Sequence, residues 1–438
     1  MKASFYTFGC KVNQYETQVL SQYFASQGFT IVPFEEEADV YVINSCTVTS
    51  TGDKKTKQLV RQTKRRSPHA VVALTGCFPQ AFPEKAAVIL EADVVAGAKD
   101  RRGLLNSVRK SIEEKQRVVT LSPHTPGEPF EPMQADFFAE HTRAFVKIED
   151  GCDRYCSYCI IPKARGPIRS KPIEEIKTEL SVLAQNGYKE VVLVGINLSS
   201  YGKETGAFRL AEAVEAACSV DGIERVRLGS LEPELLTDDD LDRMARQKKF
   251  CPQFHLSLQS GCDRTLKRMN RHYTAAEYAS LVERIRARFH NAAITTDIMV
   301  GFAGETEEDF LESVSFAEKI GFARVHVFAY SIREGTRAEK MDGHLPKSVK
   351  EARSREMIKR TDALHAAFLQ SQLLTVQSVL FETRQPDGLY TGYTENYTRV
   401  TAASDRDICG EILPVRLVSC DSEGCSGEIV SGALPEEM

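Results

Sequence analysis

Three cysteines within eight residues constrain this chain more than any other feature. Cys152, Cys156 and Cys159 lie in the run G-C-D-R-Y-C-S-Y-C-I-I-P, with CxxxCxxC spacing. Three thiolates can bind three irons of a four-iron cluster, which leaves the fourth iron free to bind a small molecule. Gly151 allows a tight turn before the first cysteine, and Pro162 keeps a helix from absorbing the last one. One loop is therefore expected to present all three sulfurs to the same point.

A zinc site is the alternative for three clustered cysteines. Zinc usually has four protein ligands, often including histidine, or three ligands and a water. No histidine lies between His141 and His255. The motif therefore favours an iron–sulfur cluster, with zinc as the simpler reading.

The length of 438 residues predicts two to four domains. No apolar run approaches the roughly 20 residues that span a bilayer. The opening M-K-A-S-F-Y-T-F-G-C lacks the apolar core of a signal peptide, so we expect a cytoplasmic protein. Twelve cysteines in that compartment favour metal or redox chemistry over disulfides.

A basic run stands out against the acidic balance of the chain. The formal net charge is −5, so the whole chain is not a basic nucleic-acid binder. From Lys54 to Arg66 the sequence K-K-T-K-Q-L-V-R-Q-T-K-R-R contains no acidic residue. The members at helical spacing are Lys54, Lys57, Arg61 and Lys64. This face is either solvated or contacts phosphates, and both readings stay open.

The first part of the chain alternates short apolar strands with helical patterns, which predicts an open parallel sheet. The expected strands are Ala3 to Phe8, Val40 to Asn44, Val71 to Thr75 and Val94 to Ala96. Three of them lead directly into Cys10, Cys46 and Cys77. Because parallel strands end at one edge, where ligands bind, we expect these cysteines to converge on a second cluster with an open iron. The alternative is that each is simply a small buried residue.

A second βα series follows a proline-rich connection. Residues 123–140 lack periodicity and predict a linker. The next strands are expected at Phe145 to Glu149, Val191 to Gly195, Arg225 to Leu228, Phe254 to Leu258, Ile294 to Val300 and Val325 to Tyr330. Helices are expected at Ile173 to Asn186, Ala275 to Phe289 and Glu307 to Lys319. Six such units predict a partial (β/α)6 barrel.

The end of the chain changes to an alternating pattern. A long charged helix is expected from Lys347 to Gln372, followed by a small antiparallel β-barrel of about 65 residues. Its cysteines lack metal-ligand spacing and are expected to be structural: Cys409, Cys420 and Cys425. The fold class is therefore α/β, with domains expected at 1–122, 141–368 and 371–437.

Polar residues and glycines follow the barrel strands, where barrel enzymes concentrate their chemistry. The candidates for binding a small molecule there are Gly195, Asn197, Ser230, Glu232, His255, Ser257, Gln259, Arg271, Gly301, Gly304 and Glu305. The Arg271 guanidinium suits a carboxylate. Each candidate has a structural alternative, such as a turn glycine or an ion pair.

The cysteine loop resembles that of the radical S-adenosylmethionine (SAM) superfamily. End to end, the chain resembles the methylthiotransferases, radical SAM enzymes that replace a C–H bond with C–S–CH3. The resemblance rests on the upstream cysteines together with G-C-D-R-Y-C-S-Y-C-I-I-P-K-A-R-G-P-I-R-S, M-N-R-H-Y-T, G-F-A-G-E-T and Y-S-I-R-E-G-T. The chain departs at Ala303, where relatives usually carry proline, and at N-L-S-S-Y-G after the second barrel strand.

The resemblance implies an N-terminal methylthiotransferase domain, a radical SAM core and a C-terminal RNA-binding TRAM barrel. It implies two 4Fe-4S clusters and SAM as cofactors, and it adds Tyr158 to the SAM contacts. The cluster that cleaves SAM to a radical would be bound by Cys152, Cys156 and Cys159. The auxiliary cluster that carries the sulfur would be bound by Cys10, Cys46 and Cys77. A second SAM would supply the methyl group.

Members of the family act on isopentenyl adenosine in tRNA, on threonylcarbamoyladenosine in tRNA, or on an aspartate of a ribosomal protein. The opening T-F-G-C-K-V-N-Q-Y-E-T is most similar to the second group. The implied reaction is methylthiolation at carbon 2 of that nucleoside, and the implied partners are a tRNA anticodon stem-loop and an external electron donor. Unstacked loop bases can enter a pocket. Three tyrosines of the C-terminal barrel are candidates for stacking or for core packing: Tyr390, Tyr393 and Tyr397.

A two-cluster electron carrier with an RNA-binding module is the rival from another functional class. Electron-carrier clusters usually have four cysteine ligands, whereas both sets here have three. The missing ligands favour chemistry at the iron.

Overall fold

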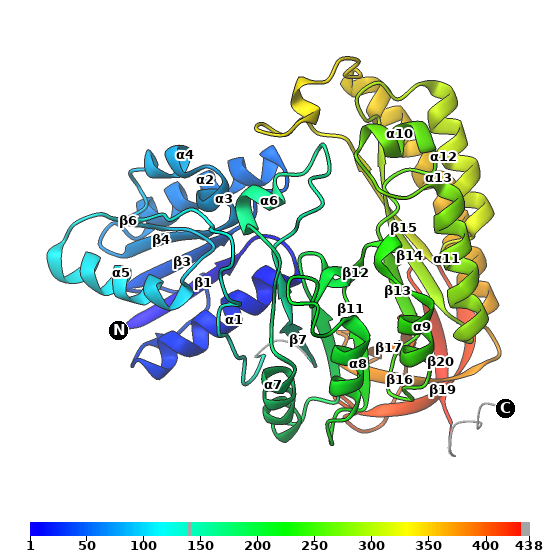
Figure 1. The fold of residues 1–438 in the computed structure, drawn as a ribbon. Coiled ribbons are helices and arrows are strands. Elements are labelled where there is room, and N and C mark those ends of the chain that lie inside the picture. Colours follow the sequence, from blue (N-terminus) through cyan, green and yellow to red (C-terminus); the bar gives the residue numbers. More distant parts are fainter. Residues whose placement is uncertain (139–141, 431–438) are drawn as a thin grey trace.

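The computed structural model describes residues 1–138 and 142–430. Three units follow one another along the chain: a parallel α/β domain, a partial barrel and a small closed β-barrel (Figure 1). The α/β fold class predicted from the sequence is confirmed. The ends of the expected linker, core and C-terminal domain fall partly outside the described residues. No helix in the described ranges is long and apolar enough to cross a membrane.

The N-terminal domain is a parallel sheet of order β2-β1-β3-β4-β5-β6. Its strands are β1 (Lys2–Thr7), β2 (Thr30–Ile31), β3 (Val40–Ser45), β4 (Val71–Gly76), β5 (Val94–Ala96) and β6 (Val118–Thr120). Its helices are α1 (Lys11–Ser26), α2 (Ser50–Arg66), α3 (Cys77–Ala81), α4 (Pro83–Ala87) and α5 (Arg101–Glu114). The sequence analysis located four of these strands and did not predict β2 and β6, which are short and lie at the sheet edges.

The central unit is a parallel barrel left open on one side. Its strands form two sheets, β11-β10-β7 and β12-β13-β14-β15. They are β7 (Arg143–Lys147), β10 (Glu190–Val194), β11 (Arg225–Leu228), β12 (Ser230–Leu231), β13 (Gln253–Leu256), β14 (Ala293–Val300) and β15 (Arg324–Ala329). Because β11 and β12 are separated only by Gly229, they occupy one strand position, and the barrel has the expected six.

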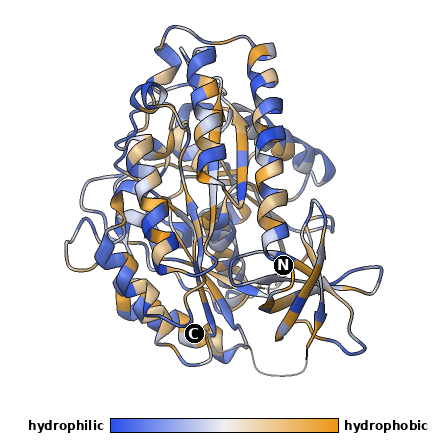
Figure 2. Cartoon of the chain, turned by 90° about the vertical axis from the view of Figure 1, so that its right-hand side faces the viewer, coloured by the Kyte–Doolittle hydropathy of each residue, from blue (hydrophilic) through white to orange (hydrophobic). Residues whose placement is uncertain are grey.

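Longer helices cover the outside of this barrel, whereas the short α6 (Ile161–Arg165) lies against the N-terminal domain. The other helices of this unit are α7 (Ile173–Gln185), α8 (Leu210–Cys218), α9 (Asp238–Ala245), α10 (Asp263–Arg268), α11 (Ala275–Arg288), α12 (Glu307–Ile320) and α13 (Lys347–Ser371). A short antiparallel pair, β8 (Glu149–Asp150) and β9 (Arg169–Ser170), flanks the cysteine loop. Figure 2 shows the strands coloured mostly as hydrophobic, with hydrophilic stripes along the outer helices. This pattern is typical of helices whose apolar side packs on the sheet and whose polar side faces solvent.

Helix α1 belongs to two cores at once. Val12 and Tyr15 pack into the core of the barrel, whereas Leu20 and Phe24 pack into the core of the N-terminal domain. In the opposite direction, the central unit contributes residues to the core of the N-terminal domain. Ile160, directly before α6, and Ala164 of α6 pack into that core near Phe78. The first two domains are therefore held together by apolar packing in both directions.

The C-terminal unit is a closed barrel of order β16-β17-β18-β20-β19. Its strands are β16 (Val376–Arg384), β17 (Tyr390–Thr394), β18 (Arg399–Ala402), β19 (Ile412–Cys420) and β20 (Cys425–Ile429). All pairs are antiparallel except β18 with β20, whose parallel pairing closes the barrel. Cys425 is buried in this core and Cys420 packs against it, whereas Cys409 is exposed.

Buried arginines hold the C-terminal barrel against the central barrel. Arg227 pairs with buried Glu190 at 2.6 Å and donates to the carbonyl oxygens of Thr394 and Glu395. Arg225 donates to the Ser378 carbonyl at 2.7 Å. Each guanidinium thereby satisfies groups on both sides of the interface.

Replacing Arg227 with methionine should destabilise this interface strongly, because the buried Glu190 carboxylate would lose its main partner. We expect a loss of about 3–5 kcal/mol, seen as a lower thermal midpoint and as proteolytic release of the C-terminal barrel. Lys189→Met is the control, because the pair of Lys189 with Glu224 is exposed and should contribute at most about 1 kcal/mol. Equal effects of the two substitutions would contradict this account.

Candidate active site between two cysteine sets

The loop that carries Cys152, Cys156 and Cys159 begins directly after β8. Its shape is held by hydrogen bonds from the Cys152 amide to the Gly166 carbonyl, 3.1 Å, and from the Cys159 amide to the Cys156 carbonyl, 3.0 Å. Gly151 has φ 94°, and a Cβ there would lie 1.9 Å from the Pro167 carbonyl oxygen. Only glycine fits this position, because it has neither the steric restriction nor the side chain.

The thiols of this loop are neighbours in a buried setting. Burial, and then the nearby charge of Cys156, raise the pKa of Cys159 to about 12. Burial, with the charge of Cys159, also raises the pKa of Cys152. Thiolates are costly here unless a cation joins them, and bound iron removes both the desolvation and the repulsion.

Two side chains aim N–H groups at these sulfurs. The Arg271 Nη1 lies 3.4 Å from the Cys156 Sγ, and the Asn197 Nδ2 lies 3.8 Å from the Cys152 Sγ. Hydrogen bonds to sulfur are among the factors that tune an iron–sulfur cluster. The residues present therefore fit a four-iron cluster with three protein ligands.

The second set of cysteines follows three adjacent parallel strands. β1 pairs with β3, and β3 with β4, so the strands end side by side. Cys10 directly precedes α1, Cys46 follows β3, and Cys77 begins α3. A Cβ on Gly9 would lie 2.9 Å from the Cys46 Cβ, which shows how closely these two loops approach. The structure thus brings the three strand ends to one edge of the sheet.

Charge and burial couple these three thiols as well. The pKa of Cys77 is raised to about 12, mainly by burial; Arg165 lowers it, and the charges of Cys46 and Cys10 raise it. The Arg165 Nε lies 3.2 Å from the Cys77 Sγ. This donor set of three free thiols beside a guanidinium also fits a cluster, which would be anionic.

A buried ionic network lies between the two cysteine sets. Glu16 of α1 accepts from Lys147 at 2.8 Å, from Arg165 at 2.5 Å and from Arg101 at 2.6 Å. Asp150, two residues before Cys152, pairs with Lys147 at 2.9 Å. The network therefore ties the N-terminal domain to the strand end and the short helix that flank the cysteine loop.

The end of β10 forms a tight pocket next to Cys152. A Cβ on Gly195 would lie 2.6 Å from the Glu149 Oε2, so glycine is required for this approach. The Asn197 amide donates to the Glu149 Oε2 at 2.7 Å, while the buried Glu149 Oε1 has no partner in the described part of the chain. Burial raises the pKa of Glu149 well above its usual value. An unpartnered buried oxygen indicates a place for a donor group of a ligand.

Arg271 is already engaged at the barrel mouth. Its guanidinium pairs with Glu232 and donates to the Ser257 carbonyl at 2.7 Å, in addition to facing Cys156. The Ser230 hydroxyl lies 2.9 Å from the Ser257 hydroxyl. Arg271 therefore orients the mouth and the cluster loop, and a ligand carboxylate would share it with Glu232.

Two other candidates have clear packing roles. A Cβ on Gly301 would meet the Lys350 side chain of α13 at 2.3 Å, so this glycine permits the helix to pack. Gln259 has φ 67° and bonds through its backbone to Asp297 and Met299 on β14. Neither observation requires a ligand.

The remaining candidates form ordinary structural contacts. Tyr158 packs edge-on against Phe302, with ring centroids 6.2 Å apart. His255 lies 3.3 Å from the Asp297 carboxylate. The turn that contains buried Ala303 is held by a hydrogen bond from the Gly304 amide to the Gly343 carbonyl, 2.8 Å, so proline is not needed there.

A cavity of about 700 Å³ runs along the inside of the barrel to the C-terminal barrel. Cys10 of the second cysteine set lines it, as do Gly195 and Ser230 of the barrel mouth. Tyr393 and Tyr397 line its far end, where their rings stack at 4.7 Å. The cavity therefore joins parts of all three domains.

The structure bears on two alternatives that the sequence left open: whether the tyrosines of the C-terminal barrel are core residues, and whether the basic face of α2 is free. Tyr390 is a core residue of the C-terminal barrel, unlike Tyr393 and Tyr397. On α2, Lys64 pairs with Asp93 at 2.8 Å and Arg61 pairs with Glu91 at 3.2 Å. Part of the basic face is therefore occupied by partners within its own domain.

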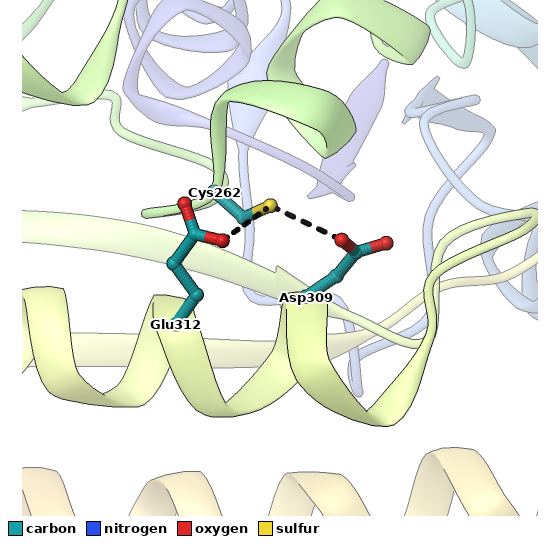
Figure 3. A group of neighbouring side chains, drawn as sticks. All are labelled: Cys262, Asp309 and Glu312. Carbon is teal, nitrogen blue, oxygen red and sulfur yellow. Dashed lines mark hydrogen bonds between the residues drawn. The ribbon is translucent and has the colours of Figure 1, made fainter.

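Cys262, Asp309 and Glu312 form a third group of possible metal ligands (Figure 3). The Cys262 Sγ lies 3.4 Å from Asp309 and 3.5 Å from Glu312. Arg264 already binds both carboxylates, at 2.6 and 2.9 Å, and Arg268 binds Asp309. Because the carboxylates are neutralised by arginine, this group is a salt-bridged helix cap.

Comparison with known proteins identifies the family of this chain. The radical SAM superfamily matches residues 146–317, and the uncharacterized protein family UPF0004 matches residues 2–97. The threonylcarbamoyladenosine tRNA methylthiotransferase of Bacillus subtilis is 35% identical, over 99% of this chain and 98% of its own. The protein of the same name from Thermotoga maritima is 37% identical over 98% of both chains. The chain belongs to the methylthiotransferase family of radical SAM enzymes.

A 4Fe-4S cluster and SAM are the cofactors of the radical SAM superfamily to which this enzyme belongs. Among solved structures, a radical SAM methyltransferase from Kitasatospora setae with cobalamin and a 4Fe-4S cluster bound has a similar fold, with a TM-score of 0.57. It is 13% identical, over 77% of this chain and 76% of that one.

Sequence reasoning missed several residues of this site. Arg165 lies inside the quoted motif as K-A-R-G-P, but nothing in its spacing shows that it reaches Cys77. Glu16 lies in a helix whose pattern indicates an ordinary surface position, and it is fully buried. A charged residue beside apolar helix positions, such as Glu16 after Tyr15, was the available signal.

Glu16→Gln should destabilise the enzyme by about 3–5 kcal/mol, because three buried cations would lose their shared carboxylate. Although burial alone raises it, Arg101, Arg165 and Lys147 hold the pKa of Glu16 well below its usual range. The stabilisation is thus present above the unfolded pKa and is lost progressively as the pH falls below about 5 towards the much lower folded pKa, so the advantage of the wild type should shrink steadily over this range and still be partly present at about pH 3. Chemical denaturation over this pH range would measure it.

The control is Glu91→Gln, which breaks an exposed pair with Arg61 and should change stability by at most about 1 kcal/mol. A pH-independent difference between wild type and Glu16→Gln would contradict the role assigned to Glu16.

Proposed function

We propose that this enzyme transfers a methylthio group to carbon 2 of N6-threonylcarbamoyladenosine beside the anticodon of a tRNA. The observation that carries the proposal is that one cavity is lined by Cys10 of the second cysteine set and by Gly195 and Ser230 at the mouth of the radical SAM barrel. Relatives named for this substrate, 35% and 37% identical over nearly the whole chain, support the choice of nucleoside.

The proposal includes one 4Fe-4S cluster on each cysteine set and SAM at the barrel mouth. When bound, these groups supply the radical chemistry that activates a C–H bond and the sulfur and methyl groups that replace the hydrogen. With three thiols in each set, each cluster would keep one iron free for a ligand other than cysteine. Such an arrangement favours two reactive centres over an electron carrier.

Residues of this chain would orient those groups and keep water out. Arg271 and Asn197 direct N–H groups at sulfurs of the first set, and Arg165 directs one at Cys77. The unpartnered Glu149 Oε1 suits the amino group of SAM. Because this region is largely buried, its electrostatic interactions are stronger than they would be in water.

The cavity suits a single unstacked nucleoside better than a duplex. Its volume of about 700 Å³ is in the range of small-molecule pockets. A base of an anticodon loop can be splayed from its neighbours to enter such a pocket. The stacked Tyr393 and Tyr397, with Arg143 5.0 Å from both rings, offer an aromatic and cationic surface at its edge. We expect tRNA to bind there, and the reaction to take place in the cytoplasm with an external electron donor.

Isopentenyl adenosine is the less supported substrate. A relative from Pelotomaculum thermopropionicum, named tRNA-2-methylthio-N(6)-dimethylallyladenosine synthase, is 33% identical over 93% of both chains. An isopentenyl group is apolar and uncharged, whereas the cavity carries Lys11, Arg143, Arg227, Arg324 and Arg399 on its walls. The lining therefore suits an acidic substituent better.

The reconstituted enzyme should contain about eight irons per chain, the content of two four-iron clusters. Replacing Cys10, Cys46 and Cys77 together with alanine should leave about four irons and retain 5′-deoxyadenosine formation, whereas Cys156→Ala should abolish it. Cys409→Ala is the control, because this cysteine is exposed and lies in neither set. A wild-type content near four irons would remove the auxiliary cluster.

Nucleoside analysis of tRNA tests the substrate. Cells that lack the gene should contain threonylcarbamoyladenosine without its methylthio group, and the wild-type gene should restore the modification. Cys156→Ala should not restore it. In cells without this or a redundant enzyme, threonylcarbamoyladenosine could instead keep its methylthio group while isopentenyl adenosine loses its own. That result would assign isopentenyl adenosine as the substrate.

A further inference from the structure

The cavity that Cys10 lines has a strongly unequal charge. Its basic lining residues are Lys11, Arg143, Arg227, Arg324 and Arg399, whereas Glu423 is its single acidic lining residue in the described ranges. A cavity with one sign of charge attracts a ligand of the opposite sign. The question is which of these cations is available to a ligand.

Two of the arginines are already neutralised. Arg143 pairs with Glu382 at 2.6 Å, and Arg227 pairs with Glu190 at 2.6 Å. Glu382 belongs to the C-terminal barrel, and Arg227 also donates to the Thr394 and Glu395 carbonyl oxygens of that barrel. The charges of the two arginines contribute to the field in the cavity, but their donors serve the interface.

Arg324 at the start of β15 and Arg399 at the start of β18 also form no ion pair within the described residues, but neither is next to a cysteine of the second set. Lys11 is next to such a cysteine. It is the first residue of α1, directly after Cys10, and it lines the cavity. Burial of its ammonium group, and then the charges of Arg143 and Arg227, lower its pKa to about 8, so it is mostly protonated at neutral pH. Within the described ranges its ammonium group forms no hydrogen bond and no ion pair, and it lies 6.0 Å from the centre of the Phe145 ring. Lys11 therefore offers all three of its N–H donors to a ligand, next to a cysteine of the second set.

The start of α1 adds to the positive potential at this point. No side chain caps the helix, and its first turn contains no acidic residue. The free N–H groups and the dipole of the 16-residue helix therefore face the same end as Lys11 without compensation from the chain. An anion placed there would interact with both.

We propose that Lys11 binds the carboxylate of the threonylcarbamoyl group and is thereby the residue that distinguishes this substrate from nucleosides with neutral N6 substituents. The inference rests on the proposed function. In adenine, C2 and the carbon that carries N6 flank the same ring nitrogen, so a group on N6 lies beside the reacting carbon. A base whose C2 lies near the second cysteine set would thus carry its carboxylate to the residue next to Cys10.

Binding of matched RNAs by the iron-loaded enzyme tests this proposal. The probes are anticodon stem-loops that carry threonylcarbamoyladenosine or its carboxylate methyl ester, which differ only in charge and one methyl group. The wild type should bind the free acid about 10-fold or more tightly than the ester, the value expected for a charge-assisted contact. Lys11→Gln should bring this ratio close to one, and Lys11→Arg should retain most of it.

Lys55→Gln is the matched control, because Lys55 is an exposed lysine of α2 outside the cavity. It should keep the wild-type ratio. If Lys11→Gln weakens both RNAs equally and keeps the ratio, Lys11 contacts the RNA backbone and the proposal is wrong. Because acid and ester are compared on the same protein, a lower iron content in a variant does not alter the ratio.

The same RNAs separate this inference from the proposed function. If the wild type fails to methylthiolate the stem-loop with threonylcarbamoyladenosine, the proposed function fails. If it does so while Lys11→Gln still discriminates acid from ester, only the role of Lys11 is wrong.

Discussion

The buried carboxylate of Glu16 is the interaction on which the site depends. It lies on a helix of the N-terminal domain and binds Lys147 and Arg165, which flank the cysteine loop of the barrel. Arg165 in turn reaches Cys77 of the other cysteine set. Buried charges are stable only when their geometry is well satisfied, so this network allows little variation in how the two domains meet. The relative position of the two cysteine sets follows from that restriction.

Apolar packing also fixes how the first two domains meet. Val12 and Tyr15 enter the barrel core, and Ile160 and Ala164 enter the N-terminal core. Each of these residues lies within a few positions of a cysteine that we assign to a cluster. A reaction that needs two metal centres and a base in contact gains from such placement, because positions fixed by folding do not have to be ordered again when the substrate binds.

The third domain completes the cavity rather than the metal centres. Its Tyr393 and Tyr397 form the outer wall, and the arginines of β11 hold it in place through backbone carbonyl groups. Contacts to carbonyl groups depend on backbone position more than on side-chain identity. The docking of this barrel can therefore persist while the residues at its surface vary.

The sequence by itself determined the secondary structure and the nature of the chemistry. Periodicity located most strands to within two residues, because alternation and apolar runs are local properties, and the cysteine spacing indicated open iron sites because ligand number is set locally in one loop. It predicted that Cys10, Cys46 and Cys77 converge, but it left open whether the α2 lysines are free and which tyrosines face a ligand. Only the tertiary structure decided these points, and it alone revealed Glu16, Arg165 and Lys11. Their roles depend on which side chains from distant segments share a buried space, and no local pattern in the chain encodes that.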